Sequence, residues 1–256
     1  MVGAGGLASN LAPALRKAGH CITAVYSRTM ATAEELAREV DSRATDDISR
    51  LPLTADCFIV AVKDGVMQHV VSRLAENRQN QMMVHTAGSM PMALLEGHTQ
   101  RYGVLWPMQT LSRGRRVDFS EVPLFIEASD DEVMLTLRSL AASVSRSVIP
   151  MSSEERKYMH LAAVFACNFA NHCYALAAEI MEQHGLGFGL IQPLIAETAR
   201  KIVQLHPSEA QTGPAVRYDQ NVISRQAALL EGQPLVQQVY NVLSQSIHRI
   251  ALEKKK

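Results

Sequence analysis

The sequence lacks several features that mark common classes of protein. Its 256 residues carry 25 Lys and Arg against 25 Asp and Glu, so there is no net charge to attract nucleic acid or an anionic membrane surface. The four cysteines form no Cys-x-x-Cys pair, and no histidine spacing completes a zinc-binding set. We therefore expect no metal site and no nucleic-acid partner.

Membrane and export signals are also missing. No unbroken apolar run is long enough to span a bilayer. No basic segment followed by an apolar stretch and a cleavage site occurs near the start. Hydrophobic residues make up 47% of the chain and charged residues 20%, which is typical of globular proteins. The expectation is a cytoplasmic protein without a membrane partner.

Up to about residue 150, short β-prone runs alternate with segments of helical apolar spacing. This alternation predicts parallel βαβ units with helices on both faces of a sheet, an α/β fold. The expected strands are 21–26, 57–62, 82–86, 103–106, 124–126 and 147–149, and the expected helices are 7–18, 31–40, 66–75 and 132–143.

After Pro150 only helical patterns follow. The run Ser-Ser-Glu-Glu that ends at Glu155 is a helix-start signal, with acidic groups near the positive end of the helix dipole. A long helix is expected from there to about His184, followed by helices over 190–205, 222–231 and 235–252. The sequence thus predicts an α/β domain over residues 1–150 and an all-helical substrate or dimerisation domain over 151–256.

The opening stretch MVGAGGLA contains the pattern Gly-x-Gly-x-x-Ala at Gly3, Gly5 and Ala8. The first glycine permits a tight turn, the second lets the backbone approach a pyrophosphate, and the small third residue lets the helix pack on the strand. We expect Gly3, Gly5, Gly6, Leu7 and Ala8 to hold a dinucleotide at the first helix N-terminus of a Rossmann domain. A strand–turn–helix junction that uses glycine for its geometry alone is the alternative.

Only Met1 and Val2 precede this turn, whereas a strand usually has about five residues. Either the first strand is very short, or a few native residues are absent from this chain.

The end of the second expected strand bears on the choice of nucleotide. An NAD site usually has an acidic residue about 20 positions after the glycine turn, bonded to the ribose 2′-hydroxyl. This chain instead has Ser27, Arg28 and Thr29, two hydroxyls and a cation that suit a 2′-phosphate. The sequence therefore favours NADP over NAD, and an exposed turn with an incidental arginine is the alternative.

Together with the strand end Ile-Val-Ala-Val-Lys-Asp (residues 59–64), these motifs resemble the superfamily of pyrroline-5-carboxylate reductase, 6-phosphogluconate dehydrogenase and F420-dependent NADP reductases. The resemblance implies that Ala61, Val62 and Lys63 border the ribose and nicotinamide of the cofactor. It also implies that Ala87 and Gly88, at the end of the next strand, lie near the nicotinamide.

The second half of the chain narrows the resemblance. Residues 161–169 and the element Thr-Gly-Pro-Ala-Val-Arg-Tyr-Asp at 212–219 resemble the helical domain of a Rossmann-like oxidoreductase family, whose C-terminal part is known only as domain of unknown function 2520. A helical domain like that of 6-phosphogluconate dehydrogenase is implied. Two positions depart from the family: Tyr218 stands where we expect glycine, and Gln226 where we expect histidine. A catalytic role for that histidine does not carry over.

A polar stripe runs along the expected long helix. With about 3.6 residues per turn, Lys157, His160, Asn168 and His172 fall within roughly a third of its circumference. Buried amides and imidazoles cost about 1–3 kcal/mol each if unpaired, so the stripe should face water, a polar partner or a ligand. Related β-hydroxyacid dehydrogenases use a Lys and an Asn on the equivalent helix. We expect His160 or Lys157 to donate a proton and Asn168 to orient the substrate, with an interdomain polar face as the alternative.

Further substrate contacts are expected at Trp106, Pro107, His172, Arg217 and Asp219. Trp106 is the only tryptophan in the chain, and it ends a strand on the side where open α/β sheets bind ligands. A core anchor is the alternative for Trp106, and a mutual ion pair is the alternative for Arg217 and Asp219.

These observations predict an oxidoreductase that transfers hydride between NADP(H) and a small carbonyl or imine metabolite in an interdomain cleft. A non-catalytic NADP-binding sensor or scaffold is the alternative, and a helical interaction module on a relic nucleotide fold is a third. Small-residue faces on the helices, and the resembled reductases, suggest a homodimer built through the helical domain.

Overall fold

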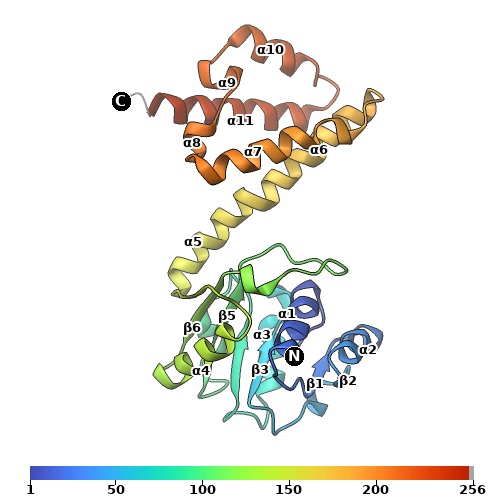
Figure 1. Ribbon diagram of the computed structural model, residues 1–256, viewed down its shortest axis with the longest axis vertical. Helices are drawn as coiled ribbons and strands as arrows, with labels where there is room; N and C mark the ends of the chain where they lie inside the picture. The colour runs from blue at the N-terminus through green and yellow to red at the C-terminus, as the bar shows by residue number, and fades with distance from the viewer. Residues whose placement is uncertain (254–256) are drawn as a thin grey trace. The chain divides into compact units, whose positions relative to one another are not determined.

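The computed structural model describes residues 1–253 and divides the chain into two compact units, Met1–Cys167 and a second that begins at Asn168. The first unit is an α/β fold and the second is all helical (Figure 1). The fold class that the sequence predicts is confirmed.

The first unit is built on seven strands. They are β1 (Ala24–Tyr26), β2 (Arg43–Thr45), β3 (Cys57–Val60), β4 (Met82–His85), β5 (Tyr102–Pro107), β6 (Leu124–Ala128) and β7 (Val148–Pro150). β1 pairs with β2, and β3 to β7 form a sheet in chain order. Val2 joins the two groups, because it makes single parallel bridges to Tyr26 of β1 and to Val60 of β3. The sheet therefore has only one or two residues in the place of its central strand.

All strand pairs are parallel except β5 with β6, which is antiparallel. The sequence predicts parallel βαβ units, and it predicts no helix between the strands that became β5 and β6, which is where the antiparallel pair occurs. The connection from Pro107 to Leu124 holds no α-helix, only the short helix η3 (Phe119–Glu121). Without a crossover helix, the chain returns alongside β5 in the opposite direction.

Helices cover both faces of the sheet. These are α1 (Gly6–Lys17), α2 (Met30–Glu39), α3 (Asp64–Ala75) and α4 (Asp131–Ala142), with the short η1 (Ile48–Arg50) and η2 (Met92–Leu95). Leu11 and Leu15 of α1 and Leu137 of α4 share one buried cluster with β3 to β6, while α3 fills a second cluster on the opposite face through Met67 and Leu74. The helices match the sequence prediction, whereas β2 has no predicted counterpart.

Helix α5 (Ser153–Ala163) belongs to the first unit. Ser152 caps it in a capping box with Glu155, as the sequence predicts. Met151 and Met159 pack against Trp106 and Phe125, so α5 is anchored on the sheet. The sequence places the domain boundary at residue 150. Helical structure does begin there, but the first compact unit continues through α5 to Cys167.

A π-helical segment, Val164–Phe169 (η4), follows α5 without a break and continues as α6 (Ala170–Gln183). Each π-type turn takes one residue more than an α-turn, so side chains beyond it rotate relative to those before it. The expected polar stripe from Lys157 to His172 presumes α-helical spacing throughout, and the spacing changes at this segment.

Within the helical stretch Ser153–Gln183, the most apolar window of 18 residues has a mean hydropathy of 1.3, and none of that window is buried. By length and composition the helix is apolar enough to cross a membrane. Polar residues scattered along it mean that the sequence holds no unbroken apolar run, which is why the sequence predicts no span. One such helix is also common in the cores of globular proteins, so it does not by itself indicate a membrane protein.

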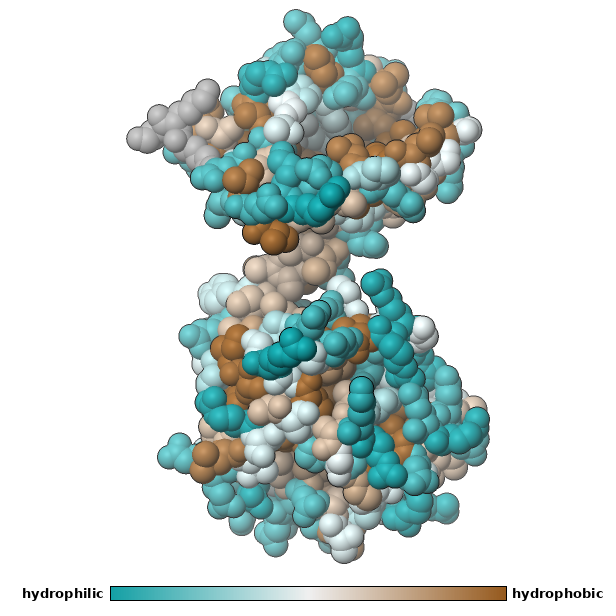
Figure 2. Space-filling view, viewed as in Figure 1, coloured by the Kyte–Doolittle hydropathy of each residue, from teal (hydrophilic) through white to brown (hydrophobic). Residues whose placement is uncertain are grey.

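The second unit continues with η5 (Phe188–Leu190), α7 (Gln192–Gln204), α8 (Pro207–Ala210), α9 (Pro214–Arg217), α10 (Gln220–Ala228) and α11 (Pro234–Glu253). Among its described residues only Ala215, Ile223, Leu230 and Ser244 are buried. Large apolar side chains such as Leu190, Val203, Leu229 and Leu235 are exposed, and Figure 2 shows apolar patches on the visible face of this unit. The helices of this unit thus leave much of their apolar surface uncovered.

Candidate functional site

The glycine-rich turn has the geometry that a close backbone approach requires. Gly3 has a φ of +111°, and a Cβ placed on it would lie 2.2 Å from the carbonyl oxygen of Ala61. Its amide donates to Tyr26 O at 2.8 Å. Any side chain at this position would collide with the end of β3, so the first glycine of the motif is required by the fold itself.

Gly5 has a different role. It is the N-cap of α1, and no side chain caps the helix there. A Cβ on Gly5 would meet no atom within 4 Å, so the space beside this residue is open, whereas a Cβ on Gly6 would lie 2.5 Å from the carbonyl oxygen of Leu111. The first-turn amides of α1 have no intrahelical acceptor and form the positive end of the helix dipole. This open cradle of N–H groups fits a diphosphate, and the residues of the motif therefore fit a dinucleotide cofactor.

A loop after β5, residues 108–117, crosses this turn. The guanidinium of Arg113 donates two hydrogen bonds to the carbonyl oxygen of Ala4, at 2.6 and 3.2 Å. Asn10 donates to Ser112 O and accepts from the amide of Val117, which pins the loop to α1. Arg113 is not among the site residues that the sequence motifs predict, although the run Arg-Gly-Arg-Arg at 113–116 is the densest cluster of cations in the first unit.

The three residues expected to bind a 2′-phosphate, Ser27, Arg28 and Thr29, lie at the end of β1, next to the glycine turn. The amide of Ser27 donates to Thr45 O, and its hydroxyl accepts from the amide of Thr29 at 3.5 Å. Thr29 is the N-cap of α2. Arg28 is exposed, and no ion pair is recorded for it within residues 1–253. The structure thus places all three residues at one edge of the cradle with a cation available.

The expected nicotinamide-side residues stand at the ends of β3 and β4. Ala61 forms the wall against Gly3, and Lys63 is the N-cap of α3. Asp64, the first residue of α3, accepts a hydrogen bond from the hydroxyl of Ser89, which connects the ends of the two strands. Val62 packs beside this turn, and a Cβ on Gly3 would lie 3.2 Å from its side chain.

Gly88, Trp106 and His160 meet at the end of the sheet. A Cβ on Gly88 would lie 2.7 Å from His160 Nδ1 and 2.8 Å from the indole of Trp106. The rings of Trp106 and His160 are 6.0 Å apart and edge-on. Trp106 is buried and also packs on Phe125, so it is both a core residue and a wall of this site. The structure therefore brings together the expected nicotinamide loop, one expected proton donor and one expected substrate residue, with Pro107 next in the chain.

A buried ion pair fixes the position of His160. The Arg156 side chain is 1% exposed, and it contacts Glu127 of β6 at 2.5 Å, the carbonyl of Met90 at 2.8 Å and the hydroxyl of Ser153 at 3.0 Å. Arg156 lies one helical turn before His160 on α5. These bonds tie α5 to β6 and to the loop that carries Gly88. Sequence reasoning missed this pair because only the fold brings positions 127 and 156 together.

His85 lies beneath this loop and is fully buried. Burial, with a contribution from the Arg156 charge, lowers the pKa of His85 to about 4. Its Nδ1 accepts from the amide of Ala87 at 3.2 Å, and its Nε2 lies 3.3 Å from Pro91 O. His85 is therefore neutral at neutral pH and holds both ends of the loop that presents Gly88.

Lys157, the second expected proton donor, has a different environment. Its ammonium pairs with Glu154 on the same helix and lies 5.1 Å from the ring of Tyr158. The hydrogen bond to Glu154 raises the pKa of Lys157, and the side chain is about half exposed. A cation stabilised in this way is a poorer acid than one with a lowered pKa.

The remaining expected site residues, Asn168, His172, Arg217 and Asp219, belong to the second unit. Asn168 and His172 are exposed. Asp219 caps α10 by accepting from the amide of Val222, and no ion pair between Arg217 and Asp219 is recorded among the described residues. Their expected roles at a substrate stay predictions.

The two departures from the family pattern have structural counterparts. Tyr218 ends α9 with a φ of 54°, in the left-handed region that favours glycine, and its ring stacks on His248 at 4.2 Å. Gln226 accepts a hydrogen bond from the hydroxyl of Tyr240 at 2.8 Å. No group of three or more His, Cys, Asp or Glu side chains that could hold a metal ion occurs within residues 1–253.

Substitution of the two glycines separates a structural role from a ligand-binding one. Gly3→Ala should lower the free energy of unfolding by about 1–3 kcal/mol or more, because the left-handed φ and the contact with Ala61 both oppose a Cβ. Gly5→Ala should change it by less than about 1 kcal/mol, because Gly5 has an extended conformation and open space. Urea unfolding measures both; equal losses would contradict the assignment.

Comparisons with known proteins follow the same division of the chain. Residues 1–108 match the model of a Rossmann-like domain, and residues 122–247 match a domain of unknown function, DUF2520. No curated protein matches the chain by sequence.

Several solved structures are similar over nearly the whole chain. A putative NADP oxidoreductase from Bacteroides fragilis is 48% identical with a TM-score of 0.93, covering 97% of this chain and 96% of that one. An imine reductase from Myxococcus stipitatus in complex with NADP+ is 18% identical with a TM-score of 0.69, covering 99% and 93%. Pyrroline-5-carboxylate reductase from Coxiella burnetii is 19% identical with a TM-score of 0.58, covering 98% and 96%.

The last two show a shared fold alone, whereas the first is close enough to establish kinship. The chain belongs to the family of proteins, represented by this Bacteroides fragilis relative, that join a Rossmann-like domain to a DUF2520 domain.

Proposed function

We propose that this protein is an NADP(H)-dependent oxidoreductase that reduces the carbonyl or imine group of a small metabolite. The observation that carries the proposal is the meeting of Gly88, Trp106 and His160 at the same sheet edge as the open glycine cradle. The names of the Bacteroides fragilis and Myxococcus stipitatus proteins support a nicotinamide cofactor in this family and fold.

The preference for NADP is supported by the end of β1. Arg28 is an exposed cation, and the hydroxyls of Ser27 and Thr29 stand beside it. A guanidinium forms charge-assisted, often bidentate, hydrogen bonds to a phosphate, and these are stronger than a hydrogen bond to a neutral ribose hydroxyl. Arg113, held on Ala4 O beside the open turn, supplies a second cation for the diphosphate that both nucleotides share.

A bound nicotinamide would supply the hydride. The residues of this chain then hold the reactants and provide a proton. We assign proton donation to the imidazole of His160, because its Nδ1 lies against Gly88 while Lys157 pairs with Glu154 on its own helix. Trp106 shields the site from water on the core side, and the Arg156–Glu127 pair keeps α5 in register with the Gly88 loop.

A non-catalytic NADP-binding sensor is the second candidate, because Gln226, whose side chain bonds to Tyr240, stands where the resemblance implies a histidine. Both candidates would bind NADP, but only the oxidoreductase would consume NADPH with a substrate. The cytoplasmic location and the absence of membrane and nucleic-acid partners likewise stay predictions.

Two arginine variants test the cofactor assignment. Arg28→Asp should weaken NADP binding by about 1.5–3 kcal/mol, the scale of a charged hydrogen bond, and leave NAD binding nearly unchanged. Arg113→Ala should weaken both nucleotides alike, because the diphosphate is common to them. Isothermal calorimetry with each nucleotide measures the four affinities. Unchanged NADP binding in Arg28→Asp would overturn the choice of NADP, and no binding of either nucleotide by the unaltered chain would overturn the proposed function.

The rate of NADPH consumption distinguishes an enzyme from a sensor, and it also distinguishes His160 from Lys157 as the proton donor. The chain should consume NADPH with at least one member of a panel of keto acids, aldehydes and cyclic imines. His160→Asn should then lower kcat by about 10²–10⁴-fold, the usual contribution of a general acid, while Lys157→Met should have a small effect. Binding without turnover across the panel favours the sensor, and a large loss in Lys157→Met alone moves the donor role to Lys157.

We also propose a homodimer formed through the helical unit. Its described residues include only four buried ones, and leucine and valine side chains on several of its helices are exposed. A second copy would bury this apolar surface, and burial contributes about 25 cal/mol of favourable free energy per Å². Sedimentation should give about twice the mass of the 28.1 kDa chain, and Leu190→Glu together with Leu194→Glu should shift the equilibrium toward the monomer. A strict monomer at all concentrations would reject the dimer.

A further inference from the structure

A segment that neither family model covers crosses the glycine turn. The Rossmann-like match ends at residue 108, and the DUF2520 match begins at residue 122. Between them, Leu111 and Val117 pack against the buried cluster that α1 shares with β3 to β6, and residues 112–116 are exposed. We call residues 111–117 the strap. Apolar packing anchors its two ends, so polar contacts decide where its exposed middle lies.

Asn10 on α1 is the buried attachment of the strap. It is 4% exposed. Its Nδ2 donates to Ser112 O at 3.3 Å and to Gly6 O at 2.9 Å, and its Oδ1 accepts from the amide of Val117 at 3.2 Å. One amide side chain therefore holds both ends of the exposed middle and is itself held by the first turn of α1. A side chain without polar atoms at position 10 would leave these backbone groups without this partner.

Two further contacts lay the strap on α1. A Cβ on Gly6 would lie 2.5 Å from Leu111 O, so the strap backbone rests directly on the first turn of the helix. Arg116 donates to Ser9 O and to the carboxylate of Glu39 on α2, and both charged side chains are exposed. Exposed ion pairs contribute little to stability, so we expect Asn10 to be the stronger attachment.

The strap brings a cation to the glycine turn. Arg113 donates to Ala4 O through Nε at 3.2 Å and Nη2 at 2.6 Å, and no ion pair is recorded for it within residues 1–253. Ala4 directly precedes Gly5, the N-cap of α1, so the guanidinium stands next to the positive end of the helix dipole. Two positive groups side by side are unfavourable unless an anion binds to both. The strap thus adds a cation where the first-turn amides already attract a phosphate.

We infer that Asn10 is a positioning residue for the diphosphate of the bound nucleotide, and that it acts through the strap. By fixing Ser112 and Val117, it holds Arg113 at the glycine turn before the nucleotide arrives, so the guanidinium loses little freedom when the diphosphate binds. This inference rests on the proposed function, because the anion is the diphosphate of NADP(H). A contribution of Asn10 to stability alone is the alternative.

Nucleotide affinities distinguish the two roles of Asn10. Asn10→Ala should raise the Kd of NADP by about fivefold or more, because Arg113 is no longer held at the turn. The double variant with Arg113→Ala should lie within about twofold of Arg113→Ala alone, because both residues act through one contact. Adenosine 2′-monophosphate, which lacks the diphosphate, should bind all these chains equally. Additive losses, or an equal loss for adenosine 2′-monophosphate, would overturn the inference.

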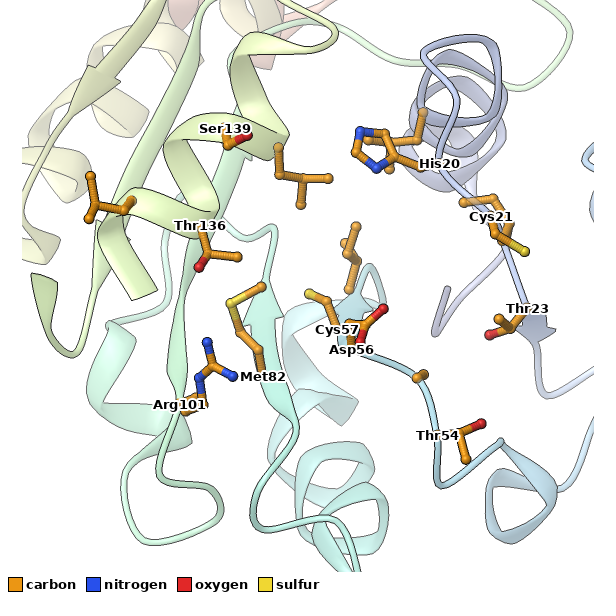
Figure 3. Close-up of a pocket in the computed structure, with 16 residues that line it drawn as sticks. His20, Cys21, Thr23, Thr54, Asp56, Cys57, Met82, Arg101, Thr136 and Ser139 are labelled. Carbon is orange, nitrogen blue, oxygen red and sulfur yellow. The ribbon is translucent and has the colours of Figure 1, made fainter. Parts of the chain in front are cut away.

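A matched arginine variant controls for net charge. Arg101 lies just before β5, at the end of that strand away from the strap, where it lines a cavity of about 770 Å³ (Figure 3). Arg101→Ala should leave the Kd of NADP unchanged, and a loss as large as that in Arg113→Ala would overturn the inference. If Asn10→Ala does not fold, Asn10→Asp makes the same comparison, because it keeps the size of the side chain and loses the amide donor.

Limited proteolysis measures the position of the strap without a nucleotide. Trypsin cleaves after arginine, and Arg113 and Arg115 lie in the exposed middle of the strap. Cleavage there should be about fivefold faster or more in Asn10→Ala than in the unaltered chain, because the strap opens locally. Leu15→Val, which trims the buried face of the same helix, should leave the rate unchanged. Equal rates in Asn10→Ala and the unaltered chain would contradict the inference.

The two measurements separate this inference from the proposed function. If the unaltered chain binds NADP and Asn10→Ala binds it equally well, the inference fails and the proposed function stands. If Asn10→Ala speeds cleavage of the strap but the unaltered chain binds neither NADP nor NAD, the proposed function fails and the role of Asn10 at a diphosphate fails with it.

Discussion

The backbone contact between Gly3 and Ala61 is the constraint on which the first unit depends. Gly3 turns the chain out of the sheet with a left-handed φ, and its missing Cβ lets the end of β3 approach within van der Waals distance. This turn allows Val2 to pair with both β1 and β3, and it starts α1 with free amides at the edge of the sheet. One steric requirement therefore joins the two halves of the sheet and creates the anion cradle.

A second constraint is the buried hydrogen-bond network that holds α5 against the sheet. Glu127, Arg156 and Ser153 form a closed set of hydrogen bonds that also includes the carbonyl of Met90 and the amide of Met92. Removing one partner from a buried pair leaves an uncompensated charge, which is far costlier than the pair's net contribution to stability. The position of His160 relative to Gly88 thus depends on side chains that touch neither.

The sequence predicts the helices and most strands because their apolar spacing and turn residues are local properties. It predicts the glycine cradle and the cluster at Ser27 because both follow expected strands at motif distances. It does not predict β2, because the strand residues Arg43–Thr45 form no apolar β-prone run. Nor does it predict the antiparallel direction of β6, which follows from the lack of a crossover helix after β5. It misses Arg113 and the Arg156–Glu127 pair because each joins segments far apart in sequence. The π-helical segment is not predicted, because the apolar and polar spacing of the sequence around it is compatible with an ordinary α-helix.

The burial of Trp106 beside Gly88 and His160 has a practical consequence. Since this is the only indole in the chain, the intrinsic fluorescence of the protein comes almost entirely from one point at the proposed reaction centre. Emission from that indole overlaps the absorption of reduced nicotinamide, so the indole would serve as an optical reporter of nucleotide binding at the proposed reaction centre. Occupancy could be followed in solution without a label, and the signal would be silent to events in the helical unit that do not reach this edge of the sheet.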